Sequence, residues 1–526
     1  MKHIFEFLKK PIVLIGAVII LGKFLGYFVD LFIAIKFGAS RITDAFIAAR
    51  AIPLRIESIV SWALYSAFVP VYIAVRKYRK EDGLILFMSF SKVVLLWLLG
   101  VSLAVVFGAE SILRFLVPGF DYQSLSLAVV LLRVMSFAIL FGGAAAILQS
   151  VNTSHNNKTI ASCSQPLNNF VVLFFVLFLT YFWGIYAIAV GVLAGAFSKM
   201  AGQLVSFDHF KGISHSQKHF EAKSQMPEIW KSFIMIVAVL LVMESIMAIT
   251  RIFASHYSGA ISILNYGYIV IQAPLLVIEG LTFYIYYPIM VEHSILDNNG
   301  RFKEMIIRFF RIMIFVLIPV SVLIFLLSGL ISRVLFLHGK FDWSTADQTA
   351  QAIALFSLGL TGLGIEAVSL RTAIVLKRTA MYLCFLIFRL FVNCILMFIL
   401  LKYLTPVVAL SVSFSIALLL NTVLLTYYFL GKVIDYKFNT EFFFYLFKVA
   451  IITLISGFCV FLLRYYFEYL GLFNGFSRRI FSLLFISLIA GIVYLLLSVL
   501  FKLKELKLLK SLFGIKTTST QIGEWL

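Results

Sequence analysis

The chain has 526 residues, of which 62% are hydrophobic and 13% are charged, and its formal net charge is +20 at pH 7. A soluble globular domain is about half apolar and about a quarter charged, so this composition excludes an ordinary soluble protein and indicates one that lies in a membrane. The lysines and arginines separate the apolar stretches and do not gather on one face, which argues against a nucleic-acid partner.

About 14 stretches are apolar and long enough to cross a bilayer, since a helical span needs about 20 residues. In chain order they are Ile12–Lys36, Ile42–Val75, Leu84–Phe107, Leu125–Leu148, Thr159–Tyr181, Gly184–Phe207, Glu228–Ile252, Ala260–Met290, Met305–Leu327, Ala350–Leu370, Met381–Leu401, Pro406–Leu430, Phe442–Tyr466 and Ile480–Phe501. The second and eighth are long, and tilt, a kink or a re-entrant piece would absorb the excess length. A solvated loop with Asp342 and Asp347 is expected around Ser328–Ala350. We therefore predict an all-α polytopic membrane protein.

The longest polar interruption, from Asp208 to Met226, separates six spans from the eight that follow. Six spans on each side with two trailing spans fit transporters built from two lobes around a central cavity. We predict an N-terminal lobe with its connector at 1–227, a C-terminal lobe at 228–430, and two further spans with a basic tail at 431–526. With a cytoplasmic N-terminus, roughly 23 lysines and arginines fall inside and roughly 8 outside, as the positive-inside rule requires. Both termini are then cytoplasmic.

No pattern in the chain points to catalysis. There is no Ser/His/Asp or Cys/His arrangement and no Gly-rich phosphate-binding loop, and the four cysteines fall within apolar spans without metal-ligand spacing. His209, His215 and His219 lie in the polar connector, where a solvated linker is favoured over a metal site because no carboxylate or cysteine completes a ligand set. We expect no enzymatic activity, no cofactor and no metal.

Charged side chains within the spans are the candidate functional residues, because a charge at membrane depth is costly and rarely idle. Lys23 and Asp30 are two helical turns apart and share a face, as do Glu244 and Arg251. The charges farthest from span ends should face protein or a watery cavity, with a cavity or relay favoured over a purely structural ion pair. They are Lys23, Asp30, Glu244, Glu279 and Arg389. Charges near span ends are expected to reach the lipid headgroups, namely Lys36, Asp44, Arg251 and Arg371.

Several sequence blocks resemble one family, in order, along nearly the whole chain. They are Leu25-Gly26-Tyr27, Asp30, Phe37-Gly38-Ala39, Thr43-Asp44-Ala45-Phe46, Pro53, Ala67-Phe68-Val69-Pro70, Pro118-Gly119-Phe120, Leu131-Leu132-Arg133, Asn152-Thr153, Pro166, Asn168, Asn169, Ile252-Phe253-Ala254-Ser255, Pro274, Pro288, Gly339-Lys340-Phe341 and Gly359-Leu360. In these blocks the chain resembles the MurJ (MviN) family of bacterial lipid II flippases, within the MATE-like flippase superfamily. The resemblance implies an inner-membrane protein that carries undecaprenyl-pyrophosphate-linked disaccharide pentapeptide from the inner to the outer leaflet by alternating access. It also implies contacts with membrane lipids and with the peptidoglycan synthesis machinery.

The family's central cavity is formed by spans one, two, seven and eight, where arginines face the pyrophosphate, and this chain differs at those arginines. The corresponding positions hold Lys23, Val29, Ile56 or Glu57, and Ile269. The resemblance, read with these changes, assigns substrate binding to seven residues, which are Lys23, Asp30, Asp44, Arg50, Arg55, Arg251 and Glu279. Arginine suits this task because its guanidinium binds phosphate oxygens in pairs.

Some relatives bind sodium between spans seven, eleven and twelve. In this chain Arg389 and Asn393 share a face one turn apart in span eleven, and Glu244 is expected opposite them. We hypothesise that Arg389 takes the place of the cation and pairs with Glu244, which would remove sodium coupling.

Other functions stay open on the sequence alone. A flippase for another polyprenyl-linked glycan or a MATE-like exporter of a small cation would share this architecture, and an acidic cavity would favour the exporter. A membrane glycosyltransferase or polymerase would need a carboxylate pair and an extracytoplasmic domain, whereas the outside segments here are short. Transport would draw on the membrane potential or on an ion gradient.

Overall fold

The computed structural model describes residues 11–78, 80–155, 157–205, 220–280, 290 and 299–506. Over these residues the chain is almost entirely helical and contains no β-strand, so the predicted all-α fold is confirmed. The chain divides into two compact units, Met1–Ser262 and Ile263–Leu526. The predicted division into lobes at 1–227 and 228–430 with two trailing spans remains a prediction.

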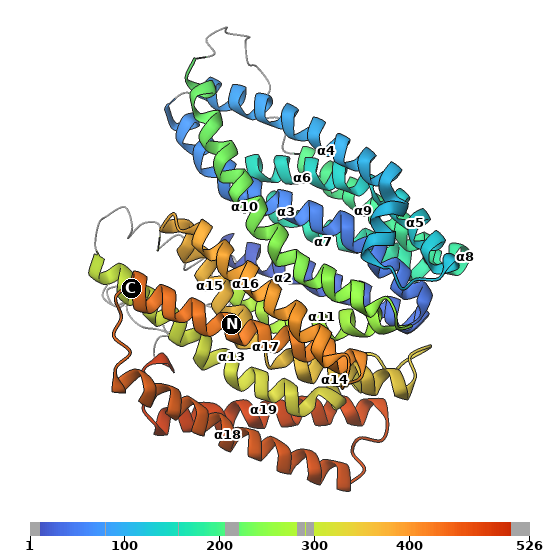
Figure 1. The fold of residues 1–526 in the computed structure, drawn as a ribbon, viewed down its shortest axis with the longest axis vertical. Coiled ribbons are helices and arrows are strands. Elements are labelled where there is room, and N and C mark those ends of the chain that lie inside the picture. Colours follow the sequence, from blue (N-terminus) through green and yellow to red (C-terminus); the bar gives the residue numbers. More distant parts are fainter. Residues whose placement is uncertain are drawn as a thin grey trace, which may run out of the picture. The chain divides into compact units, whose positions relative to one another are not determined.

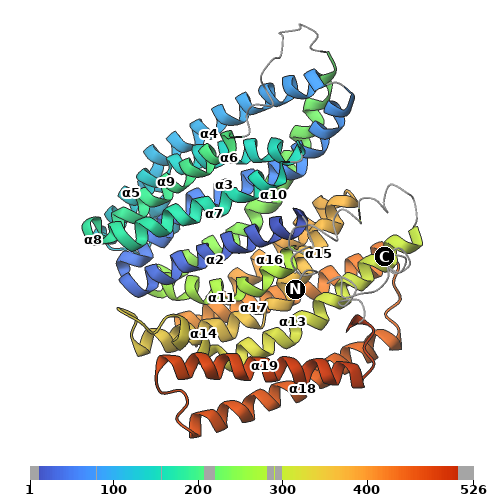
Figure 2. The ribbon, with the colours of Figure 1, turned by 180° about the vertical axis from the view of Figure 1, so that it is seen from behind.

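The first unit is built around long helices that approach one another through small residues. Its elements are α2 (Pro11–Phe37), α3 (Arg41–Tyr78), α4 (Lys80–Leu116), α5 (Tyr122–Met135), α6 (Phe137–Ser154), α7 (Lys158–Phe174), the π-helical turn η1 (Phe175–Leu179), α8 (Thr180–Trp183), α9 (Ile185–Leu204) and α10 (Phe220–Ala254). Helix α7 packs against α2 and α9, α6 packs against α3 and α9, and α10 packs against α3 and α4 (Figures 1 and 2). A Cβ atom at Gly22 would come within 2.7 Å of the Pro166 ring, so glycine permits the contact of α2 with α7.

The second unit has α13 at its centre. Its elements are α11 (Ala260–Gly280, from Ile263 on), α13 (Asn299–Leu335), α14 (Trp343–Ser357), α15 (Leu360–Val375), α16 (Thr379–Leu400), α17 (Pro406–Thr426), the π-helical turn η4 (Tyr427–Val433), α18 (Thr440–Tyr469) and α19 (Phe476–Leu500). Helix α13 packs against α14, α15, α18 and α19, and the last two helices lie side by side in both views (Figures 1 and 2).

Most of the predicted spans are confirmed as helices. Among the described residues, eleven helical stretches are long and apolar enough to cross a membrane, or twelve when α14 and α15, bent by 47°, count as one. Helices α2 and α11 occupy the positions of the predicted first and eighth spans, and the apolar stretch described in α11 is Ala260–Leu276.

The predicted solvated loop at Ser328–Ala350 is wrong over most of its length. Helix α13 continues to Leu335 and α14 begins at Trp343, so Asp347 is helical. Asp342 caps α14, because its carboxylate accepts the Thr345 N–H at 2.8 Å. The hydroxyl of Thr345 and, to a smaller extent, this backbone hydrogen bond lower the pKa of the Asp342 carboxyl. The polar residues that suggested a loop therefore belong to the N-terminal end of α14.

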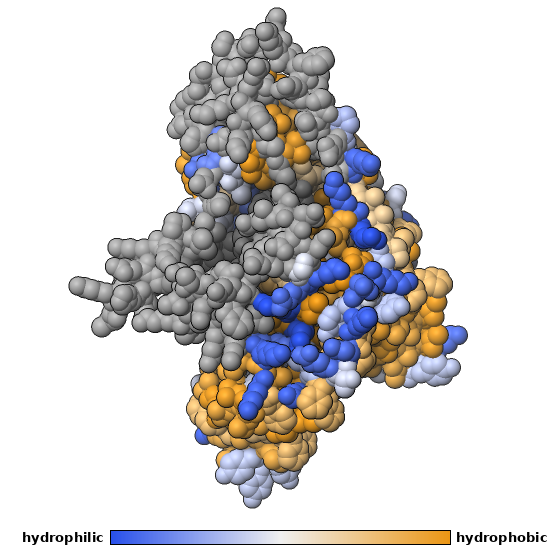
Figure 3. Space-filling model, turned by 90° about the vertical axis from the view of Figure 1, so that its left-hand side faces the viewer, coloured by the Kyte–Doolittle hydropathy of each residue, from blue (hydrophilic) through white to orange (hydrophobic). Residues whose placement is uncertain are grey.

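The outward faces of the helices are apolar. On α18 and α19 the exposed large side chains include Phe447, Leu454, Phe458, Leu484 and Leu488, which suits helices that satisfy their own backbone and turn side chains toward hydrocarbon. Hydrophilic residues instead gather on the face that Figure 3 shows, with apolar residues flanking them.

Candidate functional site

Helix α3 carries three charged side chains that pair with three different helices. Arg50 Nη2 donates to Asp30 Oδ1 of α2 at 2.5 Å, Arg55 Nη1 donates to Glu244 Oε1 of α10 at 3.0 Å, and Glu57 accepts from Lys199 of α9. Because each residue advances the helix by about 100°, Arg55 points about 140° away from Arg50 and reaches a different neighbour. These pairs make α3 the element that positions the candidate site.

The three pairs differ in their access to solvent. Side-chain exposure is 12% and 19% for Arg50 and Asp30, and 7% and 14% for Lys199 and Glu57. For Arg55 and Glu244 it is 35% and 29%. Desolvated pairs are costly to break because a lone buried charge remains, whereas exposed pairs contribute little. Of Arg50 and Arg55, the latter is therefore more accessible to a ligand.

The Asp30–Arg50 pair closes the hairpin of α2 and α3. Gly38 adopts a φ of +67°, the left-handed region that favours glycine, and lets the chain turn between the two helices. The Arg50 guanidinium also lies 5.3 Å from the centre of the Phe46 ring. Asp30 and Arg50 were both predicted as substrate-binding residues, and the structure brings them together.

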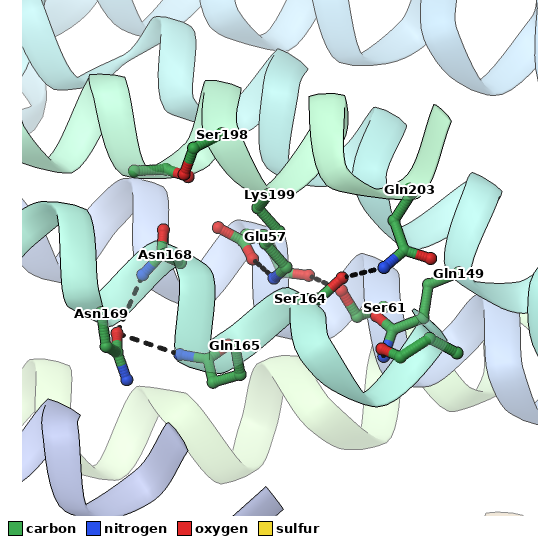
Figure 4. A network of polar contacts seen from close by, with 12 residues as sticks. Glu57, Ser61, Gln149, Ser164, Gln165, Asn168, Asn169, Ser198, Lys199 and Gln203 are labelled. Atoms are coloured by element: carbon green, nitrogen blue, oxygen red, sulfur yellow. Dashed lines mark hydrogen bonds and ion pairs between the residues drawn. The ribbon is translucent and has the colours of Figure 1, made fainter. Parts of the chain in front are cut away.

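Lys199 lies within a polar network that connects α3, α6, α7 and α9 (Figure 4). Gln203, one turn after Lys199, donates to Ser164 Oγ at 2.6 Å, and its own amide oxygen accepts from Asn152 at 2.9 Å. On α7, Asn169 donates to the Gly22 carbonyl of α2 at 2.7 Å. Lys199 and Gln203 are 5% and 1% exposed, so this network fixes the interior of the first unit.

Asp44 is fully buried and serves the turn that leads from α10 into α11. Its carboxylate accepts hydrogen bonds from the Gly259 N–H at 2.7 Å, the Ser262 N–H at 2.8 Å and the Ser262 hydroxyl at 2.6 Å. A carboxylate suits this position because the first N–H groups of a helix have no partner within it. This role differs from both predictions for Asp44, which were substrate contact and exposure at the headgroups.

Lys36 and Arg371 also differ from the prediction that they reach the headgroups. Lys36 Nζ donates to the carbonyls of Val176 and Leu177 and to Thr180 Oγ1, at 2.7, 2.9 and 2.7 Å. These acceptors belong to or directly follow the π-helical turn η1. Arg371 is only 6% exposed.

The remaining residues assigned to the substrate are placed as follows. Lys23 is exposed on α2, two turns from Asp30, and Arg251 is partly buried on α10, two turns from Glu244. The side chain of Glu279 lies outside the described part of the chain, as do the three connector histidines.

Arg389 and Glu366 form an almost fully buried ion pair in the second unit. Arg389 Nη1 donates to both carboxylate oxygens of Glu366, at 2.9 and 2.7 Å, and Asn421 Nδ2 donates to the same carboxylate at 2.9 Å. The exposed fractions are 4% for Arg389, 2% for Glu366 and 0% for Asn393 and Asn421. The predicted pairing of Arg389 with Glu244 is wrong, since Arg389 binds a carboxylate of its own unit and Glu244 binds Arg55. Helical spacing placed Arg389 and Asn393 on one face but did not identify the neighbouring helix.

Lys199 is the residue that sequence reasoning missed. The available signal was a lysine inside the predicted sixth span, on a helix whose Gly191 and Gly195 indicate close packing. A Cβ atom at Gly195 would come within 2.9 Å of both Asn168 and Val172. A cation on such a face needs a carboxylate or a carbonyl partner, and Glu57 was an acid of the second span to which no role had been assigned.

Among described residues, no group of three or more His, Cys, Asp or Glu side chains is placed to hold a metal ion. The arrangement instead offers cations and carboxylates from α2, α3 and α10. Groups of this kind can attract a charged ligand by electrostatics.

Comparisons with known proteins agree with this architecture. A family model described as Lipid II flippase MurJ matches residues 33–481. The chain is 25% identical over 498 residues to the "Probable lipid II flippase MurJ" of Buchnera aphidicola subsp. Schizaphis graminum, covering 93% of this chain and 95% of that one. It is 22% identical over 373 residues to the Lipid II flippase MurJ of Burkholderia cenocepacia, covering 68% and 71%.

Solved structures share the fold. A Lipid II flippase MurJ in an inward closed conformation has a TM-score of 0.73 at 23% identity, covering 93% of this chain and 98% of that one. An inward-facing multidrug resistance MATE family transporter of the MOP superfamily has a TM-score of 0.63 at 12% identity, covering 81% and 98%. The resemblance predicted from the sequence blocks is thus confirmed. Because the family model matches most of its length, the chain belongs to the lipid II flippase MurJ family, and it is a multi-pass protein of the inner membrane.

Proposed function

We propose that this protein is a flippase that carries lipid II, the undecaprenyl-diphosphate-linked disaccharide pentapeptide, from the cytoplasmic to the periplasmic leaflet by alternating access. Family membership supports the proposal, because the curated relatives carry the name lipid II flippase. We further propose that both termini are cytoplasmic, as the basic inside segments favour, and that the protein works beside the peptidoglycan synthesis machinery.

The charge balance on α2, α3 and α10 is the observation that carries the proposal. Of the residues assigned to the substrate, the described side chains are Lys23, Arg50, Arg55 and Arg251 against Asp30 and Asp44, and Glu244 adds a third carboxylate. The four cations outnumber the three carboxylates, and Asp44 already accepts hydrogen bonds within the protein, so an excess of positive charge remains for an anionic diphosphate. The guanidinium of Arg55 is the best placed of these to bind phosphate oxygens in a bidentate manner.

No covalent step is part of this proposal. Moving a charged headgroup across the field is worth about 2.3 kcal/mol per elementary charge per 100 mV, so the membrane potential would contribute to transport. Because a guanidinium already neutralises Glu366, we propose that Arg389 makes a sodium ion unnecessary in the second unit.

Export of a small cation is less well supported. Such an exporter needs a carboxylate that is free to bind the cation, whereas Asp30 and Glu244 are already paired with Arg50 and Arg55. A flippase for another polyprenyl diphosphate would use the same headgroup chemistry. The experiment below therefore also tests a strain that lacks such a flippase.

The test is complementation of a bacterial strain depleted of its own lipid II flippase, with membrane levels of each variant confirmed. We expect the wild type to restore growth and Lys23→Ala and Arg55→Ala to reduce or abolish rescue. Lys402→Ala, which removes an exposed lysine between α16 and α17, is the matched control and should rescue fully. Failure of a well-expressed wild type would reject lipid II, and rescue of a strain depleted of another polyprenyl-linked glycan flippase would then identify that substrate class.

A further inference from the structure

The Arg55–Glu244 contact has the properties of an interaction that a ligand can replace. A single hydrogen bond joins the two side chains, from Arg55 Nη1 to Glu244 Oε1 at 3.0 Å. A guanidinium has five N–H donors, so Glu244 uses a minority of them. We propose that Glu244 is an internal counter-anion, which occupies Arg55 in the absence of substrate and is displaced by the diphosphate of the lipid. The inference rests on the proposed function.

The two other α3 ion pairs described above show why this one is the replaceable contact. Two of the pairs, Arg50–Asp30 and Glu57–Lys199, are largely buried. The side chains of Arg55 and Glu244 are each about one-third exposed. An exposed pair contributes little stability because water already solvates both charges. A diphosphate carries more charge and more acceptor oxygens than one carboxylate, so it is the stronger partner for a guanidinium.

Displacement of Glu244 would also change how α10 is held against α3. Near its N-terminal end, α10 is fixed by aromatic contacts, because the rings of Trp230 and Phe233 lie 5.2 and 6.3 Å from the Phe90 ring of α4. The Glu244 contact lies about 17 Å farther along the helix, taking 1.5 Å per residue from Phe233. Loss of this contact would free the later part of α10 while its beginning stays anchored, and this couples headgroup binding to helix movement.

The experiment measures binding of farnesyl diphosphate to the purified full-length protein in nanodiscs. We expect Glu244→Gln to bind at least about fivefold more tightly than the wild type, the lower end of common coupling strengths. Glu110→Gln is the matched control, since Glu110 also pairs with an arginine, Arg114, but on the exposed surface of α4. Its affinity should equal that of the wild type. Inorganic pyrophosphate, tested in parallel, distinguishes recognition of the headgroup alone from recognition of the lipid.

A double variant separates displacement from simple repulsion. If Glu244 acts by occupying Arg55, Glu244→Gln should give no gain when Arg55 is already Gln. A gain that persists in Arg55→Gln/Glu244→Gln would overturn the inference, as would equal or weaker binding by Glu244→Gln alone. If that variant does not fold, Glu244→Asp, which shortens the reach to Arg55, should show a smaller gain.

Failure of this inference is distinguishable from failure of the proposed function. Binding by all variants with equal affinity would reject only the role of Glu244. Absence of farnesyl diphosphate binding in every variant, Glu244→Gln included, would reject binding of the diphosphate at Arg55, and with it the role of Glu244, while the complementation experiment decides the proposed function separately.

Discussion

Asp30 and Arg50 lie 20 residues apart in the chain and meet at 2.5 Å across the hairpin of α2 and α3. Removing one member should leave the other as an uncompensated, largely buried charge. We expect Asp30→Ala to lower the free energy of unfolding by about 3 kcal/mol, measured by denaturant unfolding in detergent. Asp347→Ala, which breaks the exposed pair with Arg333, should cost under about 1 kcal/mol. Equal costs for the two variants would show that the Asp30–Arg50 pair is solvated.

Replacement of Asp44 should loosen the turn between α10 and α11. Asp44→Ala leaves the N–H groups of Gly259 and Ser262 without their acceptor, at about 1–3 kcal/mol for each buried unsatisfied group. Asp44→Asn keeps one acceptor oxygen and should cost less. Hydrogen–deuterium exchange of the 255–265 peptide reports this directly, and protection there that survives Asp44→Ala would contradict the assignment.

The Glu366–Arg389 pair should show strong non-additivity. Glu366→Gln and Arg389→Met should each cost about 3–5 kcal/mol, because each leaves a buried charge, and the double variant should recover most of the loss. Thermal unfolding of the wild type, the two single variants and the double variant measures the coupling. The matched control is the same cycle with Glu304→Gln and Arg308→Met on the surface of α13. Additive losses at 366 and 389 would mean that the two side chains act independently.

In the same unfolding experiment, sodium should not stabilise the wild type. A bound ion raises stability in proportion to the logarithm of its concentration above its dissociation constant. A thermal-unfolding midpoint that rises with sodium chloride but not with choline chloride would show that Arg389 does not replace a cation.

Gly142 tests how tightly the Glu57–Lys199 pair is enclosed. A Cβ atom at Gly142 would lie 2.4 Å from Glu57 Oε2, whereas one at Gly100 on α4 would meet nothing within 4 Å. We expect Gly142→Ala to destabilise the protein by about 1–3 kcal/mol through overpacking. Gly100→Ala should be neutral or stabilise it by up to about 1 kcal/mol through helix propensity. A Gly142→Ala variant as stable as the wild type or more stable would mean that Glu57 moves aside freely.

The sequence predicted the helical fold and the shared faces of charged residues because both follow from apolar length and helical period. It placed Lys23 with Asp30, and Arg389 with Asn393, on common faces. It could not predict which helix each face meets, because that depends on tertiary packing, and it therefore paired Arg389 with Glu244. Asp342 was assigned to a loop for a related reason, since a polar capping residue and a polar loop have the same composition.

The division of α3's charges among three neighbours has a mechanical consequence. A slip of α3 by one residue would advance it by 1.5 Å and rotate it by about 100°, which would separate Arg50, Arg55 and Glu57 from their partners at the same time. Sliding or rotation of α3 alone is therefore opposed, because it would break all three ion pairs at once. Movement within the first unit must either carry α2, α3 and α9 together or begin at the solvent-exposed contact with α10.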